Sequence, residues 1–123
     1  EVVHVQQLPA GEGIGYGSTY VTPEPMTIAT IPVGYADGYP RSLSNRGTVL
    51  IHGTRCPVVG RICMDQFMVA VPDTITVKPG DKVVLLGSQG HESISALEIA
   101  ALASTIPYEI FCGFSERVPR QYI

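Results

Sequence analysis

The fold of this chain is decided by the stretch Thr48-Val49-Leu50-Ile51-His52-Gly53-Thr54-Arg55-Cys56-Pro57-Val58-Val59. It contains two short apolar runs, residues 48–51 and 57–59, which are rich in β-branched side chains. Such runs favour β-strands, and His52 lies in the turn between them. The stretch therefore predicts two strands joined by a hairpin turn.

Other parts of the chain repeat this pattern of short apolar runs bounded by turn-forming residues. Three further strands are expected at Met26–Ile31, Phe67–Val71 and Lys82–Leu86, and weaker candidates at Val2–Leu8 and Tyr108–Phe114. Many short strands with frequent turns are typical of sandwiches and barrels. The predicted fold is mainly β, a partly closed antiparallel β-barrel or sandwich with one short helix near the C-terminal end.

The single expected helix covers residues 96–103, where apolar residues recur at helical spacing. Ser95 and Glu98 form the pattern of a capping box, in which hydroxyl and carboxylate bind free amide groups of the first turn. Pro107 is expected to end the helical region, because the residue before a proline is pushed away from helical angles.

Composition indicates one domain that spans residues 1–123, with 45% hydrophobic residues and a formal net charge of −3. Eight basic residues are scattered among eleven acidic ones, so neither a nucleic acid nor a membrane surface is an expected partner. The first residues, 1–4, lack the basic and apolar features of a signal peptide, and we expect a cytoplasmic protein.

The three cysteines, Cys56, Cys63 and Cys112, form no C-x-x-C pair and have no histidine cluster near them. No metal site or disulfide framework is predicted, and buried reduced thiols are expected. The two lysines, Lys78 and Lys82, flank a Pro-Gly-Asp turn that should be exposed. An exposed turn does not lower the pKa of an amine, so neither lysine is a candidate nucleophile.

Two glycine-rich segments contain tyrosines, residues 13–20 and 34–41. Tyr16 stands between two glycines, which let the backbone approach a ligand closely and leave the ring without neighbouring side chains. The segment is thus either a site whose ring projects toward a ligand or an ordinary turn with an exposed ring.

A third segment, residues 59–66, places Arg61, Asp65 and Gln66 between two apolar strands. Polar groups inside a sheet need hydrogen-bond partners. These residues therefore form either a satisfied network in the core or a strand end that faces a site.

Several motifs occur together and in the order of one known family. They are Gly15-Tyr16-Gly17-x-Thr19, Ile31-Pro32-Val33-Gly34-Tyr35-Ala36-Asp37-Gly38, Val59-Gly60-Arg61-Ile62-Cys63-Met64-Asp65-Gln66, Gly80-Asp81, Thr105-Ile106-Pro107-Tyr108-Glu109 and Arg117-Val118-Pro119-Arg120. The chain resembles the C-terminal domain of the alanine racemases.

This resemblance implies an isomerase that interconverts L- and D-alanine with pyridoxal 5'-phosphate, which a lysine of an N-terminal α/β barrel holds. The expected partners are that barrel domain, from the same and from the partner subunit of a homodimer, and a small amino-acid substrate. Because the 123 residues contain no such barrel, the domain alone is expected to be inactive.

The resemblance also implies roles for single residues. Tyr16 matches the tyrosine base of a two-base mechanism, and Met64 matches the residue whose backbone amide binds the substrate carboxylate. Asp65 would orient that turn, and Tyr35 would line the narrow entrance. Tyr108 matches the tyrosine that hydrogen-bonds the cofactor phosphate.

Three further residues, Arg41, Arg61 and Ile106, match the outer entrance corridor of the family. The substrate stays open, because racemases of serine or of other amino acids share this domain. A second interpretation is a non-catalytic β-barrel module, derived from a racemase, that dimerises or binds a ligand.

Overall fold

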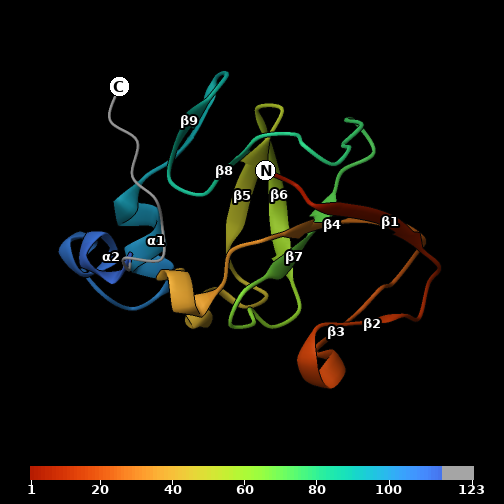
Figure 1. The fold of residues 1–123 in the computed structure, drawn as a ribbon, viewed down its shortest axis with the longest axis horizontal. Helices are drawn as coiled ribbons and strands as arrows, with labels where there is room; N and C mark the ends of the chain where they lie inside the picture. The colour runs from red at the N-terminus through yellow and green to blue at the C-terminus, as the bar shows by residue number, and fades with distance from the viewer. Residues whose placement is uncertain (115–123) are drawn as a thin grey trace.

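The computed structural model describes residues 1–114, and at Tyr16 the backbone alone. Its centre is a six-stranded antiparallel sheet that curls into a half barrel (Figure 1). In spatial order the strands are β1 (His4–Leu8), β4 (Met26–Ile31), β7 (Phe67–Val71), β6 (Thr54–Val59), β5 (Thr48–Ile51) and β8 (Val83–Val84). This confirms the prediction of a mainly β fold with a partly closed antiparallel barrel.

Strand β4 is covered on both faces, because successive side chains of a strand point to opposite sides. Ala29 and Ile31 lie in the main core, whereas Ile28 belongs to a smaller apolar cluster. That smaller cluster contains Ile14 and is flanked by Tyr20. The outer face of the sheet is therefore covered by the segment that contains residues 14 and 20.

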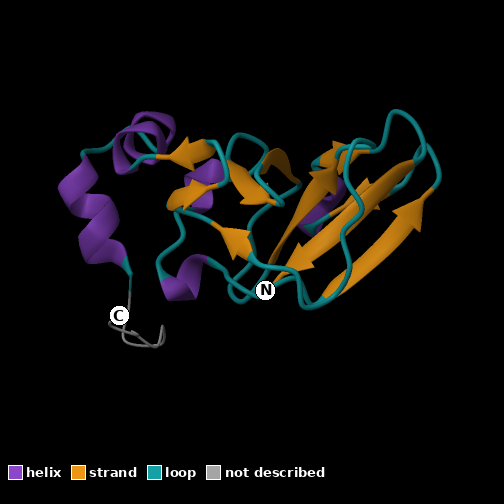
Figure 2. Cartoon of the chain, turned by 90° about the horizontal axis from the view of Figure 1, so that it is seen from above, coloured by secondary structure: helices purple, strands orange, loops and turns teal. Residues whose placement is uncertain are grey.

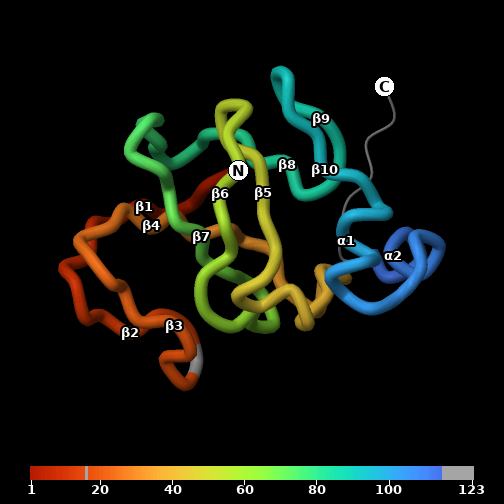
Figure 3. Tube along the Cα trace, turned by 180° about the vertical axis from the view of Figure 1, so that it is seen from behind, coloured from red at the N-terminus to blue at the C-terminus, as the bar shows by residue number. Residues whose placement is uncertain are grey.

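This covering segment is a short arm formed by two paired strands, β2 (Gly13–Ile14) and β3 (Tyr20–Val21). A 3-10 turn, η1 (Tyr16–Ser18), closes the arm at its tip. Figure 3 shows the arm at the lower side of the sheet, far from the helices. Burial of Ile14, which is 2% exposed, anchors the arm to β4, β6 and β7.

Two α-helices pack together at the other end of the molecule, α1 (Ala96–Leu102) and α2 (Pro107–Gly113), as Figure 2 shows. The expectation of one helix, with a strand at Tyr108–Phe114, is wrong. Proline fits the first turn of a helix, where its missing amide has no partner to lose, so Pro107 begins α2. The motif Arg117–Arg120 lies outside the described residues.

Helix α1 begins as predicted, since the Ser95 hydroxyl accepts a hydrogen bond from the Glu98 amide at 3.0 Å. The Glu98 carboxylate does not complete the capping box and instead binds the Arg55 guanidinium with both oxygens, at 2.8 and 3.0 Å. Arg55 also binds Glu92 in the hairpin of β9 (Gly87–Gln89) and β10 (Glu92–Ile94). This arginine thus ties β6 to the helical end of the domain.

The remaining expectations hold in part. The predicted strand Lys82–Leu86 is reduced to Val83–Val84, which pair with the end of β5. Cys56 is buried, but Cys63 is half-buried and Cys112 is exposed, so the expectation of three buried thiols is wrong. Within residues 1–114 no single helix is long and apolar enough to cross a membrane, and only the bent pair α1 and α2 meets that test together.

Candidate functional site

The first part of the candidate site is the loop that follows β4, where a 3-10 turn, η2 (Tyr35–Asp37), begins at Gly34. The Asp37 carboxylate accepts a hydrogen bond from the Gly34 amide at 3.0 Å and closes this turn. The amides of Tyr35 and Ala36 donate to the carbonyls of Cys63 and Met64, at 3.0 and 3.1 Å. The loop after β4 is therefore fixed to the loop after β6.

Gly34 is required at this junction because the two loops touch. A Cβ atom at this position would lie 2.2 Å from the Cys63 oxygen and 2.3 Å from the Met64 oxygen. No side chain fits at such distances. The glycine between Val33 and Tyr35 thus lets two family motifs meet at one end of the sheet.

The second part is the turn at residues 63–66, which the hydrogen bond from the Cys63 amide to the Gln66 carbonyl closes at 2.9 Å. Ile62 is 1% exposed and anchors the turn, whereas Met64 at its tip is 51% exposed. Arg61 and Asp65 are exposed as well. The segment 59–66 is therefore a strand end that faces outward and not a polar network in the core.

The third part is the arm with η1. The backbones of Gly15 and Gly60 both adopt positive φ angles, 77° and 81°. A Cβ atom on Gly15 would lie 2.9 Å from the Arg61 amide nitrogen, and one on Gly60 would lie 2.8 Å from the Ile14 oxygen. These close approaches bring the backbone of Tyr16 beside Arg61. The direction of the Tyr16 side chain lies outside the described part of the structure.

Positive charge gathers next to the three loops. Arg41 begins the 3-10 turn η3 (Arg41–Leu43), and it lines a surface hollow together with Ser44 and Arg61. The Arg61 guanidinium also lies 3.8 Å from the position of a Cβ atom on Gly17. Two guanidinium groups beside exposed loop tips favour an anionic group such as a carboxylate.

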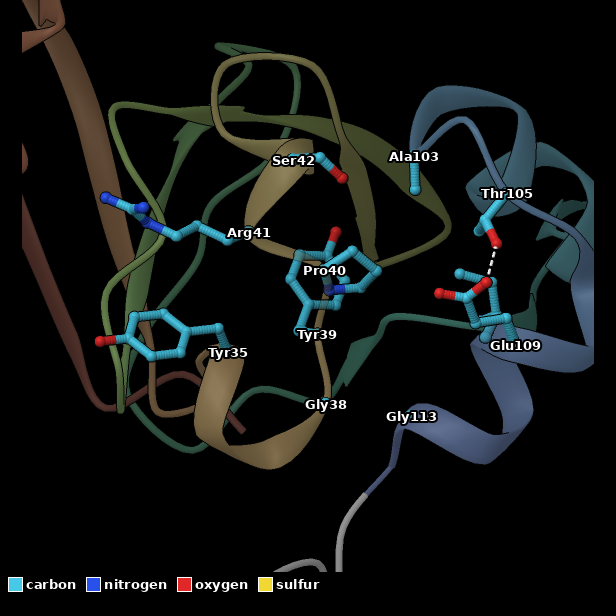
Figure 4. A pocket seen from close by; sticks show the side chains of 11 residues that line it. Tyr35, Gly38, Tyr39, Pro40, Arg41, Ser42, Ala103, Thr105, Glu109 and Gly113 are labelled. Atoms are coloured by element: carbon cyan, nitrogen blue, oxygen red, sulfur yellow. Dashed lines mark hydrogen bonds between the residues drawn. The ribbon is translucent and has the colours of Figure 1, made fainter.

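A neighbouring pocket connects these loops with α2 (Figure 4). Tyr35 and Arg41 point to one side of the pocket, and Thr105, which donates a hydrogen bond to Glu109, lies on the other. Tyr39 forms part of the lining and stacks on Phe67 with ring centroids 4.8 Å apart. Burial, reinforced by the charge of Glu98, raises the pKa of the Tyr39 phenol, so this tyrosine stays neutral.

The structure brings some predicted site residues together and leaves others apart. Tyr35, Met64, Asp65 and Arg61 lie on the joined loops, and Arg41 shares the hollow with Arg61. Ile106 and Tyr108 lie at the start of α2, where their side chains are 62% and 74% exposed, and neither lines the pocket of Figure 4. Ile106 and Tyr108 thus face a surface outside this pocket.

The chemistry of the described residues fits a contact to pyridoxal phosphate at the start of α2 but not its attachment. Tyr108 offers an exposed phenol as a hydrogen-bond donor for a phosphate. Lys78 and Lys82 are exposed, and the Lys78 amide binds the Asp81 carboxylate in a turn outside the joined loops. Among residues 1–114, no group of three or more His, Cys, Asp or Glu side chains could hold a metal ion.

The chain is similar to known proteins of one family. The family model described as "Alanine racemase, C-terminal domain" matches residues 1–122. The chain belongs to the alanine racemase family. An alanine racemase of Symbiobacterium thermophilum is 63% identical over 118 residues, which cover 96% of this chain and 31% of that protein. An alanine racemase of Halothermothrix orenii is 56% identical and is covered to 32% of its length.

Solved alanine racemases share the fold. The structure from E. faecalis is 48% identical with a TM-score of 0.94, and the match covers 99% of this chain and 32% of that one. The structure from Bartonella henselae, with covalently bound pyridoxal phosphate, is 39% identical with a TM-score of 0.91, over 99% of this chain and 33% of that one. The chain therefore spans about a third of the length of these relatives.

Two residues that the sequence motifs do not point to, Ser44 and Asn45, follow η3. The Asn45 side chain accepts a hydrogen bond from the Gly60 amide at 2.6 Å and donates one to the Thr19 hydroxyl at 3.2 Å. The Ser44 hydroxyl accepts one from the Ile62 amide at 2.8 Å. A Ser-Asn pair before Arg46-Gly47 indicates a turn, but nothing in the sequence shows which distant amides it binds.

Proposed function

We propose that this chain is the C-terminal domain of a pyridoxal-phosphate-dependent alanine racemase and that its three joined loops form one wall of the active site. The observation that supports this most directly is the contact of η2 with the Met64 turn and of Gly15 with Arg61. These contacts join three separate family motifs at one exposed end of the sheet. The family membership and the bound ligand of the Bartonella henselae relative support the cofactor.

In this proposal Tyr16 moves a proton on one face of the substrate α-carbon. A phenol has a pKa near 10 and is a weak base at neutral pH, so positive charge or hydrogen bonds must stabilise its anion. Arg61 lies beside the backbone of η1 and can contribute to that stabilisation. The second base, on the opposite face, is a lysine of the barrel domain.

Met64 and its neighbours bind the substrate carboxylate. The carbonyls of Cys63 and Met64 are held by amides of η2, which fixes the turn without using its exposed tip. Asp65 stands next to Met64 at that tip and orients it. Because the turn is fixed before binding, little conformational entropy is lost when a small anion binds there.

The cofactor contact of this chain is Tyr108, whose phenol donates a hydrogen bond to the phosphate. Pyridoxal phosphate, when bound, supplies the electron sink that makes the α-hydrogen of an amino acid acidic. The site also needs a lysine from a barrel domain. In this proposal, as the family resemblance implies, the complete enzyme is a homodimer in which this domain contacts the barrels of both subunits. Tyr35 lines the narrow entrance, and Arg41, Arg61 and Ile106 line the corridor that leads to it.

The test compares two tyrosines of the arm in the full-length racemase loaded with cofactor. Tyr16→Phe removes the proposed base, whereas Tyr20→Phe removes a hydroxyl whose hydrogen-bond partner within residues 1–114 is the Met26 sulfur, at 3.6 Å. We expect Tyr16→Phe to lower racemisation in both directions by a factor of about 100 or more. Tyr20→Phe should retain the wild-type rates. Equal rates for Tyr16→Phe and wild type would refute the proposal.

A further inference from the structure

Among the described residues, few hydrogen bonds link the arm that contains Tyr16 to the sheet. Its tip, η1, is followed by Thr19, and the residues that lead into it, Ile14 and Gly15, lie against the backbone of Gly60 and Arg61. Among the described residues, the backbone hydrogen bonds of residues 13–21 stay within the arm. The position of η1 therefore depends on the burial of Ile14 and on side chains that reach it from the sheet.

Asn45 is a side chain that makes such a link. Its carboxamide lies between Gly60, at the end of β6, and Thr19, at the end of η1. The Gly60 amide can only donate, so the Asn45 oxygen must face it and the Asn45 nitrogen must face the Thr19 hydroxyl. The planar amide thus sets the spacing between the arm and the strand end from which the Met64 turn begins.

The backbone of Asn45 is suited to this position. Its φ angle is 60°, in the left-handed region that asparagine, aspartate and glycine adopt more readily than other residues. Ser44 binds the Ile62 amide next to it, so the pair binds two alternate amides of the segment that leads into the Met64 turn. Residues 44 and 45 therefore contact two of the three parts of the proposed site, the arm and the segment that leads into the Met64 turn.

We propose that Asn45 is a positioning residue for catalysis, which holds η1, and with it Tyr16, at a fixed distance from the Met64 turn. This inference rests on the proposed function. Asn45 touches neither substrate nor cofactor in this account and acts only through Thr19 and Gly60. Loss of the Asn45 side chain should misplace Tyr16 and disturb proton transfer on the face of the substrate α-carbon that Tyr16 serves. Proton transfer on the opposite face, which the lysine serves, should be unaffected.

The variants follow from the geometry. Asn45→Gly removes the bridge and keeps a backbone that accepts φ 60°. Asn45→Asp keeps the bridge, because one carboxylate oxygen accepts a hydrogen bond from the Gly60 amide and the other accepts one from the Thr19 hydroxyl. Thr19→Val cuts only the contact to the arm and keeps the side-chain shape. Comparison of the three variants separates the effect of the Asn45 contact with Thr19 from the effect of its contact with Gly60.

In the loaded full-length enzyme we expect Asn45→Gly to lower kcat about tenfold or more with KM changed less than about twofold, because the lost contact concerns orientation. The α-deuterium isotope effect should rise only in the direction in which Tyr16 removes the proton. Thr19→Val should share this change, and Asn45→Asp should restore wild-type behaviour.

A second readout needs no activity. Amide hydrogen exchange on this chain should show Gly60 exchanging about tenfold faster or more in Asn45→Gly, and unchanged in Asn45→Asp and Thr19→Val. The inference is overturned if Asn45→Gly keeps the wild-type kcat, isotope effects and Gly60 exchange. It is also overturned if both isotope effects rise equally. Failure of the proposed function is distinct, since Tyr16→Phe would then racemise normally whatever Asn45→Gly does.

Discussion

Replacing Gly34 by alanine would drive a methyl group into the Met64 turn. The φ angle of Gly34 is −145°, which alanine adopts without strain, so the effect is purely steric. The new Cβ atom would lie 2.2 Å from the Cys63 oxygen, and both nearest groups are backbone carbonyls that cannot rotate away. The turn must then move by about 1 Å to reach ordinary van der Waals contact.

The structure sets the expected size of this effect. The movement strains or breaks the bonds from the Tyr35 and Ala36 amides to the turn, each worth about 1 kcal/mol. Overpacking adds about 1–3 kcal/mol, so the free energy of unfolding should fall by about 2–5 kcal/mol. A displacement of about 1 Å at a binding turn can lower the catalytic rate about 100-fold.

Urea unfolding of this chain and racemisation by the full-length enzyme measure the two effects. The matched control is Gly80→Ala, where a Cβ atom meets nothing within 4 Å but the φ angle is +96°. This control should cost about 1–2 kcal/mol of stability through backbone strain and leave kcat unchanged. Wild-type stability and wild-type racemisation in Gly34→Ala would refute the proposed junction between the two loops.

Three further predictions concern the rest of the domain. Arg55 lowers the pKa of the Glu98 carboxylate, chiefly by hydrogen bonding, so the pair stabilises the fold at neutral pH and this contribution is lost as pH falls through that lowered pKa. Glu98→Gln should lower the free energy of unfolding by less than about 1 kcal/mol at pH 7, because the pair is exposed. This difference from wild type should shrink toward zero in acid. A difference that grows in acid would contradict the stabilising role of the pair. Burial raises the pKa of the Cys56 thiol to about 11, so iodoacetamide at pH 8 should label the exposed Cys112 of the folded chain and spare Cys56, as mass spectrometry would show; early labelling of Cys56 would count against its burial. Ser95→Ala should destabilise the domain by about 1 kcal/mol in urea unfolding, because the cap of α1 is lost, and an unchanged midpoint would show that this cap contributes nothing.

The strands of the sheet could be predicted from sequence because their signal is local. Met26–Ile31, Thr48–Ile51 and Phe67–Val71 have the predicted bounds, since each is a β-branched run that turn residues interrupt. The error at Tyr108–Phe114 has a physical reason. A proline disfavours a helix that precedes it, but it is also favourable at the first position of a new helix, where Pro107 lies.

The site could be predicted only in part, because it is held together by contacts between segments that are distant in the sequence. The motifs around Tyr16, Tyr35 and Met64 are visible in the sequence through glycines and polar interruptions. The sequence does not show that Gly34 touches the Met64 carbonyl or that Asn45 bridges Thr19 and Gly60. These contacts depend on the curl of the sheet and on the placement of the arm over β4.

Apolar residues of the arm are important for the polar site because their burial holds the arm in place. Ile14 is buried between β4, β6 and β7, so it fixes one end of the arm while Asn45 fixes the other. The glycines at positions 15 and 60 let the two backbones meet. Burial, close backbone packing and one carboxamide together set the place of η1.

The most direct test of the account is the loss of α-deuterium from each alanine enantiomer, catalysed by the full-length Tyr16→Phe enzyme in ordinary water. If Tyr16 serves one face and a lysine serves the other, one enantiomer should still lose its deuterium without inversion. The other enantiomer should keep its deuterium, and racemisation should almost stop. Loss of deuterium from both enantiomers at wild-type rates, with racemisation intact, would show that Tyr16 is not the base on either face.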